Sequence, residues 1–313
     1  MDKNVCVIVP TCNGGEIWER AALQLSKLKN KTVFIITIDS ESTDSTREIS
    51  EGYGFDVIGI KRKDFNHGGT RNIAARYCID KLKAEFLVFL TQDAILQTPE
   101  KVIDEIVKRF EVNADISAIY GKQLPHDDAN YLAEHARYYN YRDEAYKATP
   151  TNCCTMGLKA VFLSNSFSAY HSHVFSLLGG FPENTILCED MYFAAKSIKN
   201  GYSIGYCPDV AVKHSHNYTP LAEFKRYFDI GVFHSCEPWI NQMFGGATGE
   251  GKKFLFSEAN YLIRRNPLWI VPACINNAMK LLGYKAGKNF KRLSPEKCKA
   301  LSMHKAYWKS ETK

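Results

Sequence analysis

The sequence has no hydrophobic run long enough to cross a lipid bilayer. Over its 313 residues, no apolar stretch approaches the roughly 18 consecutive residues that a membrane-spanning helix needs. We also expect no signal peptide, because Met1–Asn4 leads directly into the first strand-like segment. We therefore expect a protein of the cytoplasm rather than a secreted or membrane-spanning one.

Cysteine spacings typical of zinc-binding sites or of a disulfide framework are missing as well. The sequence contains 10 cysteines, but none form a CxxC pair, and Cys153 and Cys154 are adjacent. This spacing disfavours a structural zinc site and a disulfide framework. Reduced thiols in a reducing compartment, most of them acting as small core residues, are the expected state.

Two nucleotide-binding fingerprints are missing too. Gly14-Gly15 follows the first apolar run, but the glycine pattern GxGxxG of dinucleotide-binding proteins is not there, and neither is a P-loop. We find no internal repeat and no low-complexity segment. A dehydrogenase is therefore disfavoured.

Charge is unevenly distributed along the chain. The net charge is +6, yet residues 252–313 hold 14 Lys or Arg against 3 Glu and no Asp, which leaves −5 for residues 1–251. A basic segment on a mildly acidic body suits an anionic partner surface, and it also suits a solvated tail. Charge alone does not distinguish an anionic partner surface from a solvated tail. We expect no nucleic-acid partner.

Strand and helix patterns alternate in the first 121 residues. Composition is that of a globular protein, with 45% apolar and 24% charged residues. Short apolar runs predict strands at 4–9, 32–38, 55–60, 86–90 and 117–120, and helical spacing predicts helices at 16–29 and 70–82. This order implies a parallel sheet covered by helices.

Polar clusters follow four of these strands. They occupy residues 11–15, 39–44, 61–72 and 91–93. Ligands of open parallel sheets bind beyond the carboxyl ends of the strands, where these clusters would meet. The sequence therefore predicts one polar, carboxylate-bearing binding edge.

Later segments are harder to interpret. Residues 122–185 are irregular and rich in aromatic side chains. A helix is expected at 190–200, a strand at 203–207, and further helices at 221–234 and 254–265.

Taken together and in order, the motifs resemble the bacterial rhamnosyltransferases of glycosyltransferase family 2. The resemblance rests on VIVPTCN from Val7, DSESTD from Asp39, FNHGGTRN from Phe65, TQDA from Thr91, GGFPE from Gly179, EDM from Glu189, HSHNYT from His214 and FKRYFDIG from Phe224. It covers about residues 4–235 and adds little after residue 250. It implies the GT-A fold: a Rossmann-like, mostly parallel sheet flanked by helices, here with a helical C-terminal extension.

The resemblance also implies a division of labour along the chain. Residues 1–121 would bind the nucleotide-sugar donor, 122–235 would form the acceptor-binding and catalytic region of the same domain, and 236–313 would be the basic extension. The implied donor-binding residues are Thr11, Asn13, Asp39, Ser42, His67, Gly68, Gly69, Arg71, Asn72, Gln92 and Asp93. Residue chemistry agrees, because an Asp can pair with a nucleotide base and an Arg fork suits phosphate. Asp39 as a turn residue and Arg71 as a surface residue remain alternatives.

A divalent cation, Mg²⁺ or Mn²⁺, is expected at Asp93. The family pattern is DXD, whereas this chain has Thr91-Gln92-Asp93, so one acidic ligand is missing. Asp93 could instead be a turn residue. His214 and His216 alternate along an extended segment and would face opposite sides, so we expect only one of them, preferably His214, to reach the metal or diphosphate.

Asp190 is the expected general base, with Glu189 as second choice. An inverting transfer needs one carboxylate to take the proton of the acceptor hydroxyl. Carboxylates at a helix N-terminus also stabilise the helix, and one of the pair could do only that.

The expected reaction is transfer of L-rhamnose from dTDP-L-rhamnose to a hydroxyl of a lipid-linked precursor of a cell-surface polysaccharide. A UDP-hexose donor, or a catalytically silent GT-A-like binding module, are the alternatives. Apolar residues from Trp269 to Leu282, next to many lysines, suit peripheral contact with the inner face of an anionic membrane. A helix docked on the domain, or a contact between copies of the chain, would leave the same pattern.

Overall fold

The structure, a computed structural model, describes residues 3–28, 31–245 and 248–309. The chain divides into two compact units that do not follow chain order. Unit 1 is formed by Met1–Leu124, Tyr141–Glu183 and Glu189–His214, and unit 2 by Pro125–Asn140, Asn184–Cys188 and Ser215–Lys313. The functional boundaries expected at residues 121 and 235 remain a prediction.

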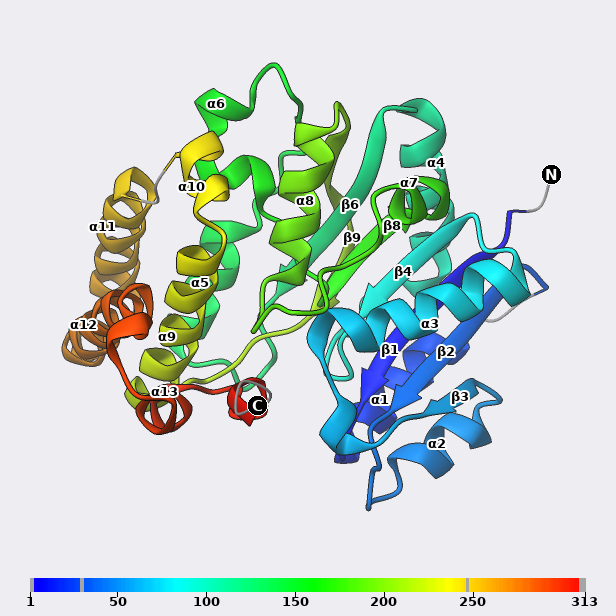
Figure 1. The fold of residues 1–313 in the computed structure, drawn as a ribbon, viewed down its shortest axis with the longest axis horizontal. Helices are drawn as coiled ribbons and strands as arrows, with labels where there is room; N and C mark the ends of the chain where they lie inside the picture. The colour runs from blue at the N-terminus through cyan, green and yellow to red at the C-terminus, as the bar shows by residue number, and fades with distance from the viewer. Residues whose placement is uncertain (1–2, 29–30, 246–247, 310–313) are drawn as a thin grey trace. The chain divides into compact units, whose positions relative to one another are not determined.

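Four parallel strands form the first half of the sheet in unit 1. They are β1 (Val5–Thr11), β2 (Val33–Asp39), β3 (Asp56–Gly59) and β4 (Phe86–Leu90), in the order β3-β2-β1-β4 (Figure 1). The register places Thr11 beside Asp39, and Asp39 beside Gly59. The carboxyl ends of these strands therefore meet at one edge, as the alternating pattern predicted.

The second half of the sheet is mixed. It contains β8 (Phe167–His171), β6 (Ile116–Leu124), β9 (Ser203–Lys213) and the short β5 (Ile95–Leu96), with β7 (Tyr146–Ala148) beside β9. Strand β8 runs antiparallel to both β4 and β6, and β6 runs parallel to β9. The polar clusters therefore share one edge of the sheet with the carboxyl ends of β4, β6 and β9 and with the amino end of β8.

Strand β9 is longer than predicted. Pro208 and Asp209 resemble a strand end, so the sequence pattern stops at Cys207. In the structure the pairing with β6 shifts from Cys207 to Ala211 through an irregularity, and the strand continues to Lys213. A β-bulge tolerates a proline because the bulged residue makes no ladder hydrogen bond. The continuation carries the chain to His214.

Helices cover the sheet of unit 1. They are α1 (Gly15–Ser26), α2 (Thr46–Gly52), α3 (His67–Leu82), α4 (Pro99–Val112), α6 (Cys153–Met156), α7 (Ser172–Leu177) and α8 (Glu189–Lys199). Helix α3 begins three residues earlier than predicted, because the Asn66 side chain caps it by accepting a hydrogen bond from Gly69 N at 2.8 Å. The core gathers the apolar side chains of β1 and β4 with Trp18 of α1 and Phe110 of α4.

Unit 2 is helical. It contains α5 (Tyr131–Asn140), α9 (Pro220–Cys236), α10 (Pro238–Phe244), α11 (Thr248–Arg265), α12 (Ile270–Lys288) and α13 (Pro295–Leu301). Helices α9 and α12 approach closely because glycines line their contact: a Cβ on Gly283 would lie 2.2 Å from the carbonyl oxygen of Phe224. Within the described part of the chain, no helix combines the length and the apolar character that spanning a membrane requires.

Candidate active site

Three of the expected donor-binding residues are joined at the ends of β1 and β2. Thr11 Oγ1 donates to Asp39 Oδ1 at 3.1 Å, and Ser42 N donates to Asp39 Oδ2 at 3.0 Å. Asp39 is buried and organises the loop that follows its strand, as an Asp in a turn does. These hydrogen bonds are the ones that the alternative interpretation, a turn residue, requires, and the role of Asp39 in base recognition stays a prediction.

The loop after β1 is attached to the loops after β2 and β4. Asn13, which adopts a left-handed backbone (φ 47°), accepts a hydrogen bond from Thr43 N at 2.8 Å through Oδ1. Gln92 pairs with the Cys12 peptide group in both directions: Cys12 N donates to Gln92 Oε1 at 2.8 Å, and Gln92 Nε2 donates to Cys12 O at 3.2 Å. An amide side chain can both accept and donate in this way, so Gln92, at the middle position of Thr91-Gln92-Asp93, ties the loop after β4 to the loop after β1.

Asp93 and His214 face each other at the same edge. Strand β5, two residues after Asp93, pairs with the end of β9, and this brings Asp93 Oδ2 to 3.4 Å from His214 Nε2. The other ring nitrogen, Nδ1, lies 2.9 Å from Gln123 Oε1. Because the Gln123 amide nitrogen donates to Ser164 Oγ at 2.9 Å, its oxygen is turned to the ring, and Nδ1 must carry the hydrogen.

This geometry suits a divalent cation. With the hydrogen on Nδ1, Nε2 of a neutral ring presents a lone pair to the Asp93 carboxylate, and two acceptors at this distance need a cation or proton between them. A carboxylate together with an imidazole fixed by an amide on its far side is a common ligand arrangement. Asp93 and His214 thus form a potential metal site.

His216 belongs to the same group of potential ligands. The expectation that the two histidines point to opposite sides is wrong, because it assumed a continuous strand. Strand β9 ends at Lys213, so strict alternation does not apply beyond it. Two residues of chain span at most about 7 Å, which keeps His216 near His214 along the backbone.

Gly68 and Asn72 of α3 contact the loop that contains the GGFPE sequence. A Cβ on Gly68 would lie 2.0 Å from the carbonyl oxygen of Pro182. Asn72 Nδ2 donates to Phe181 O at 2.9 Å, and Asn72 Oδ1 accepts from Phe181 N at 3.0 Å. The two glycines were expected to precede the helix, but both lie in its first turn, and Gly68 admits a loop of the protein itself. Donor contacts by Gly68, Gly69 and Asn72 stay predictions.

Arg71 is buried beside Glu189, so the alternative of a surface arginine is wrong. Arg71 Nη1 lies 3.3 Å from Glu189 Oε1 and donates to His67 O at 2.9 Å. Burial favours a higher pKa for Glu189, but Arg71, His67 and Asn165 outweigh it and hold that pKa below its usual value. Burial lowers the pKa of His67. A direct contact of Arg71 with the donor diphosphate stays a prediction.

Asp190 differs from its neighbour in exposure and in charge environment. It remains partly accessible to solvent, whereas Glu189 is 5% exposed. Desolvation, followed by the negative charge of Glu189, raises the pKa of Asp190 to about 7. A carboxylate with this pKa accepts and releases a proton near neutral pH, which is the property of a general base.

Asn165 connects the two carboxylates and was not identified in the sequence. Asn165 N donates to Asp190 Oδ2 at 3.1 Å, and Asn165 Nδ2 donates to Glu189 Oε1 at 2.9 Å. Its own Oδ1 accepts from Tyr170 OH at 2.7 Å, so the amide is fixed. The one sequence signal is that Asn165 is a polar residue just ahead of the segment FSAY. Without knowing that β8 pairs with β4, this signal does not show that Asn165 lies near the two carboxylates.

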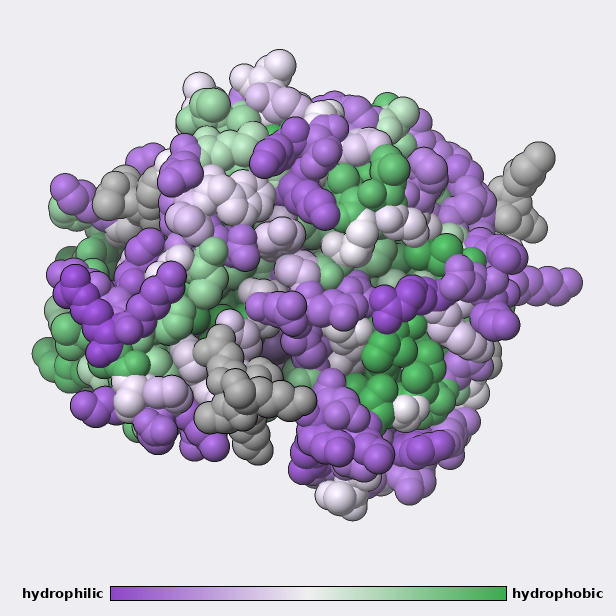
Figure 2. Space-filling view, in the orientation of Figure 1, coloured by the Kyte–Doolittle hydropathy of each residue, from purple (hydrophilic) through white to green (hydrophobic). Residues whose placement is uncertain are grey.

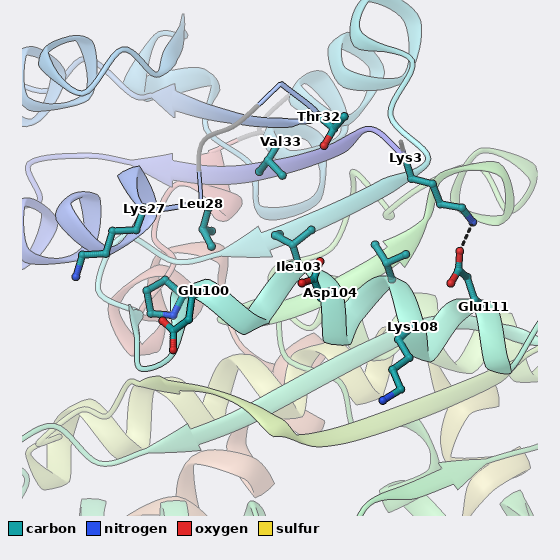
Figure 3. A pocket seen from close by; sticks show the side chains of 12 residues that line it. Lys3, Lys27, Leu28, Thr32, Val33, Glu100, Ile103, Asp104, Lys108 and Glu111 are labelled. Carbon is teal, nitrogen blue, oxygen red and sulfur yellow. Dashed lines mark ion pairs between the residues drawn. The ribbon is translucent and has the colours of Figure 1, made fainter. Parts of the chain in front are cut away.

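A hollow of about 460 Å³ lies elsewhere on unit 1. Figure 3 shows it between α4 and the chain near Lys3 and Val33, where β1 and β2 begin, with Lys3 paired to Glu111 at 3.2 Å. The polar clusters lie at the opposite, carboxyl ends of these strands. This hollow is therefore no part of the candidate active site.

Two comparisons with curated proteins cover nearly the whole chain. The chain is 47% identical over 303 residues to the O-antigen chain rhamnosyltransferase WbaN of Salmonella anatum, covering 96% of this chain and 95% of that protein. It is 46% identical over 308 residues to the O-antigen chain rhamnosyltransferase RfbN of Salmonella typhimurium, covering 97% and 96%.

Solved structures share the fold at low sequence identity. Staphylococcus aureus TarS 1-349 in complex with UDP-GlcNAc matches 96% of this chain and 84% of its own, with TM-score 0.58 and 18% identity. The mannosyltransferase PcManGT of Pyrobaculum calidifontis, in complex with GDP-Man and Mn²⁺, matches 99% and 86%, with TM-score 0.55 and 18% identity. The expected GT-A fold with C-terminal helices is confirmed.

A family comparison agrees with the site and the fold. Residues 6–174 match the family described as Glycosyl transferase family 2, and this range holds the polar edge, Asp93 and Asn165. The expected activity class is confirmed, and the silent binding module is disfavoured. This chain is a glycosyltransferase and belongs to family 2.

Proposed function

We propose that this protein is an inverting rhamnosyltransferase that moves L-rhamnose from dTDP-L-rhamnose to a hydroxyl of a lipid-linked O-antigen precursor. The observation that carries the proposal is Asp190, a partly accessible carboxylate whose pKa is raised to about 7. Asn165 lies just before β8, whose amino end is at the same edge of the sheet as Asp93 and the carboxyl ends of β1 and β2. Because Asn165 N donates to Asp190, Asp190 also lies at this edge. Rhamnose as the sugar is supported by the two named relatives.

In this mechanism Asp190 takes the proton of the acceptor hydroxyl. The acceptor oxygen then forms a bond to the anomeric carbon from the side opposite the diphosphate, and the bond from that carbon to the diphosphate oxygen breaks. The nucleoside diphosphate leaves with the bonding electrons, and the anomeric configuration inverts. One carboxylate suffices, because the sugar never becomes attached to the protein.

Glu189 is assigned a positioning role. Its carboxylate is engaged by Arg71 and Asn165, and its negative charge raises the proton affinity of Asp190. Arg71 keeps Glu189 ionised, and Asn165 orients both carboxylates. On this assignment Asp190 is the base, and Glu189 supplies a neighbouring negative charge that raises the pKa of Asp190.

Donor recognition is assigned to the polar edge. Thr11, Asn13, Asp39, Ser42 and Gln92 form the connected loops, and we propose that their remaining hydrogen-bonding groups bind the nucleotide. Asp93 and His214, with His216 as a further candidate, would hold Mg²⁺ or Mn²⁺. The ion, when bound, would neutralise the diphosphate and make it a better leaving group. Mn²⁺ in PcManGT supports a divalent ion.

A donor panel tests the sugar. The purified protein is incubated with Mn²⁺, a lipid-linked acceptor and either dTDP-L-rhamnose or one of several UDP-hexoses. We expect product only with dTDP-L-rhamnose. Preferential transfer from a UDP-hexose would contradict the proposed donor while leaving the activity class intact.

The proposed location is the cytoplasmic side of the cell membrane. All 10 cysteines are free, and this is the state that a reducing compartment maintains. The C-terminal helices could instead form a contact between copies of the chain, which is the alternative to a membrane contact.

A further inference from the structure

Helix α12 buries small residues and exposes large apolar ones, whereas most surface helices of globular proteins bury their large apolar residues. Its buried positions are Ala273, Asn276, Gly283 and Gly287. The two glycines contact α9 so closely that a Cβ on Gly287 would lie 2.0 Å from the carbonyl oxygen of Phe228. The residues that α12 buries are small, and Tyr284 adds a contact with α9, its OH lying 2.9 Å from His234 Nδ1. Several large aliphatic side chains of α12 are instead exposed.

Those large side chains lie on the other face of the same helix. Val271, Ile275 and Leu282 are 67%, 50% and 55% exposed, and their spacing of four and seven residues places them on one stripe. Leu268, just before the helix, is 84% exposed. Figure 2 shows hydrophobic surface where α12 lies in Figure 1. We call Leu268, Val271, Ile275, Leu281 and Leu282 the apolar stripe.

Basic residues flank the apolar stripe. Lys285 continues the same face of α12, and Arg264, Arg265, Lys291 and Arg292 are exposed just before and after the helix. Two acidic groups beside α12 are engaged within unit 2: Glu223 pairs with Lys280 at 3.3 Å, and Glu258 is buried and bonded to Asn277. The stripe therefore lies in a positively charged surrounding.

We propose that the apolar stripe and its basic flanks dock on an anionic phospholipid surface. Exposed aliphatic side chains bordered by Lys and Arg match the boundary between acyl chains and negatively charged headgroups. A protein partner would need complementary shape, whereas a bilayer needs only this combination of apolar and positive surface. The inference rests on the proposed function only in that a lipid-linked acceptor gives the contact its purpose.

Vesicle binding tests the apolar part. The full chain is co-sedimented with vesicles of phosphatidylcholine alone or with added phosphatidylglycerol. The variant Ile275→Asp/Leu282→Asp should lose binding by tenfold or more, since each side chain would otherwise be buried in the lipid. The matched control is Leu177→Asp, which changes a side chain that is 63% exposed on α7 of unit 1 and should leave binding unchanged.

A second pair of variants tests the basic part. Lys285→Gln/Lys291→Gln should weaken binding to phosphatidylglycerol vesicles by about fivefold per lysine, and high salt should weaken binding of the unchanged protein. Lys101→Gln/Lys108→Gln, with both lysines exposed on α4, is the charge-matched control and should bind normally.

Three outcomes would overturn the proposal. The unchanged protein could ignore phosphatidylglycerol vesicles, the α12 variants could bind like the unchanged protein, or light scattering could show a dimer that Ile275→Asp/Leu282→Asp converts to a monomer. In the last case the stripe joins two copies of the chain. Transfer to a water-soluble acceptor should survive in the α12 variants. In the unchanged protein, transfer without vesicle binding would count against this inference alone, and vesicle binding without transfer would count against the proposed function alone.

Discussion

At the scale of single residues, neighbouring carboxylates in the sequence have acquired different chemistry. Glu189 is buried against Arg71, and its pKa is lowered. Asp190 is partly accessible, and desolvation together with the charge of Glu189 raises its pKa to about 7. Two adjacent carboxylates cannot both ionise easily in a poorly hydrated site, so the arginine decides which one carries the charge.

Removing the base should abolish most of the transfer. Asp190→Asn keeps the shape of the side chain and removes its basicity, so we expect turnover to fall by about 10²-fold or more. Calorimetry with dTDP and Mn²⁺ should show nearly unchanged nucleotide binding. Near-normal turnover in Asp190→Asn, combined with loss of turnover in Glu189→Gln, would reverse the assignment.

The pH dependence reports on the same pair. Asp190 acts only when ionised, so kcat/KM should rise with pH and level off above an apparent pKa of about 7. Glu189→Gln removes a negative charge that raises the Asp190 pKa and frees the positive charge of Arg71. Both changes favour the ionised form of Asp190, so the rise should move to lower pH. A shift to higher pH would show that another group titrates.

Asp93 should make nucleotide binding depend on the metal. In Asp93→Ala we expect the gain in dTDP affinity on adding Mn²⁺ to shrink by tenfold or more, because losing even a supporting partner of a ligand costs that much. The control, Asp104→Asn, alters an exposed carboxylate of α4. Equal affinity of the unchanged protein with and without Mn²⁺ would remove the metal role of Asp93.

At the scale of elements, the start of α3 is fixed by its contact with the loop containing Pro182. Gly68→Ala would place a Cβ 2.0 Å from Pro182 O, so the loop must shift, and overpacking of this kind costs about 1–3 kcal/mol. The apparent urea midpoint should fall. Gly52→Ala, at the end of α2 with no atom near its added Cβ, should be neutral or slightly stabilising. Equal midpoints for the two variants would refute the close contact.

Sequence patterns predicted the elements better than their ends. The buried strands β1, β2 and β4 are continuous apolar runs, which only a two-sided core explains. The start of α3 was missed because His67, Gly68 and Gly69 are poor helix formers, whereas the Asn66 cap and the loop around Pro182 decide it. The end of β9 was missed because a bulge accommodates Pro208.

At the scale of the whole molecule, the predicted site depends on which strands are neighbours. Parallel order alone placed Thr11, Asp39 and Asp93 at one edge. Asn165 was missed because its contacts depend on β8 inserting antiparallel between β4 and β6, and Gln123 was missed because its contact with His214 depends on β6 pairing with β9. A single sequence carries no signal for these pairings. The apolar stripe of α12 was partly foreseen as apolar residues next to lysines, but the face it exposes depends on the glycine contact with α9.

The stereochemistry of the product tests the central claim most directly. The unchanged protein and Asp190→Asn are incubated with dTDP-L-rhamnose, Mn²⁺ and acceptor, and the anomeric configuration of the product is determined by NMR spectroscopy. We predict a rhamnosyl product of inverted configuration from the unchanged protein and at least about 10²-fold less of it from Asp190→Asn. A product of retained configuration, or full activity of Asp190→Asn, would contradict the assignment of Asp190 as the base of an inverting transfer.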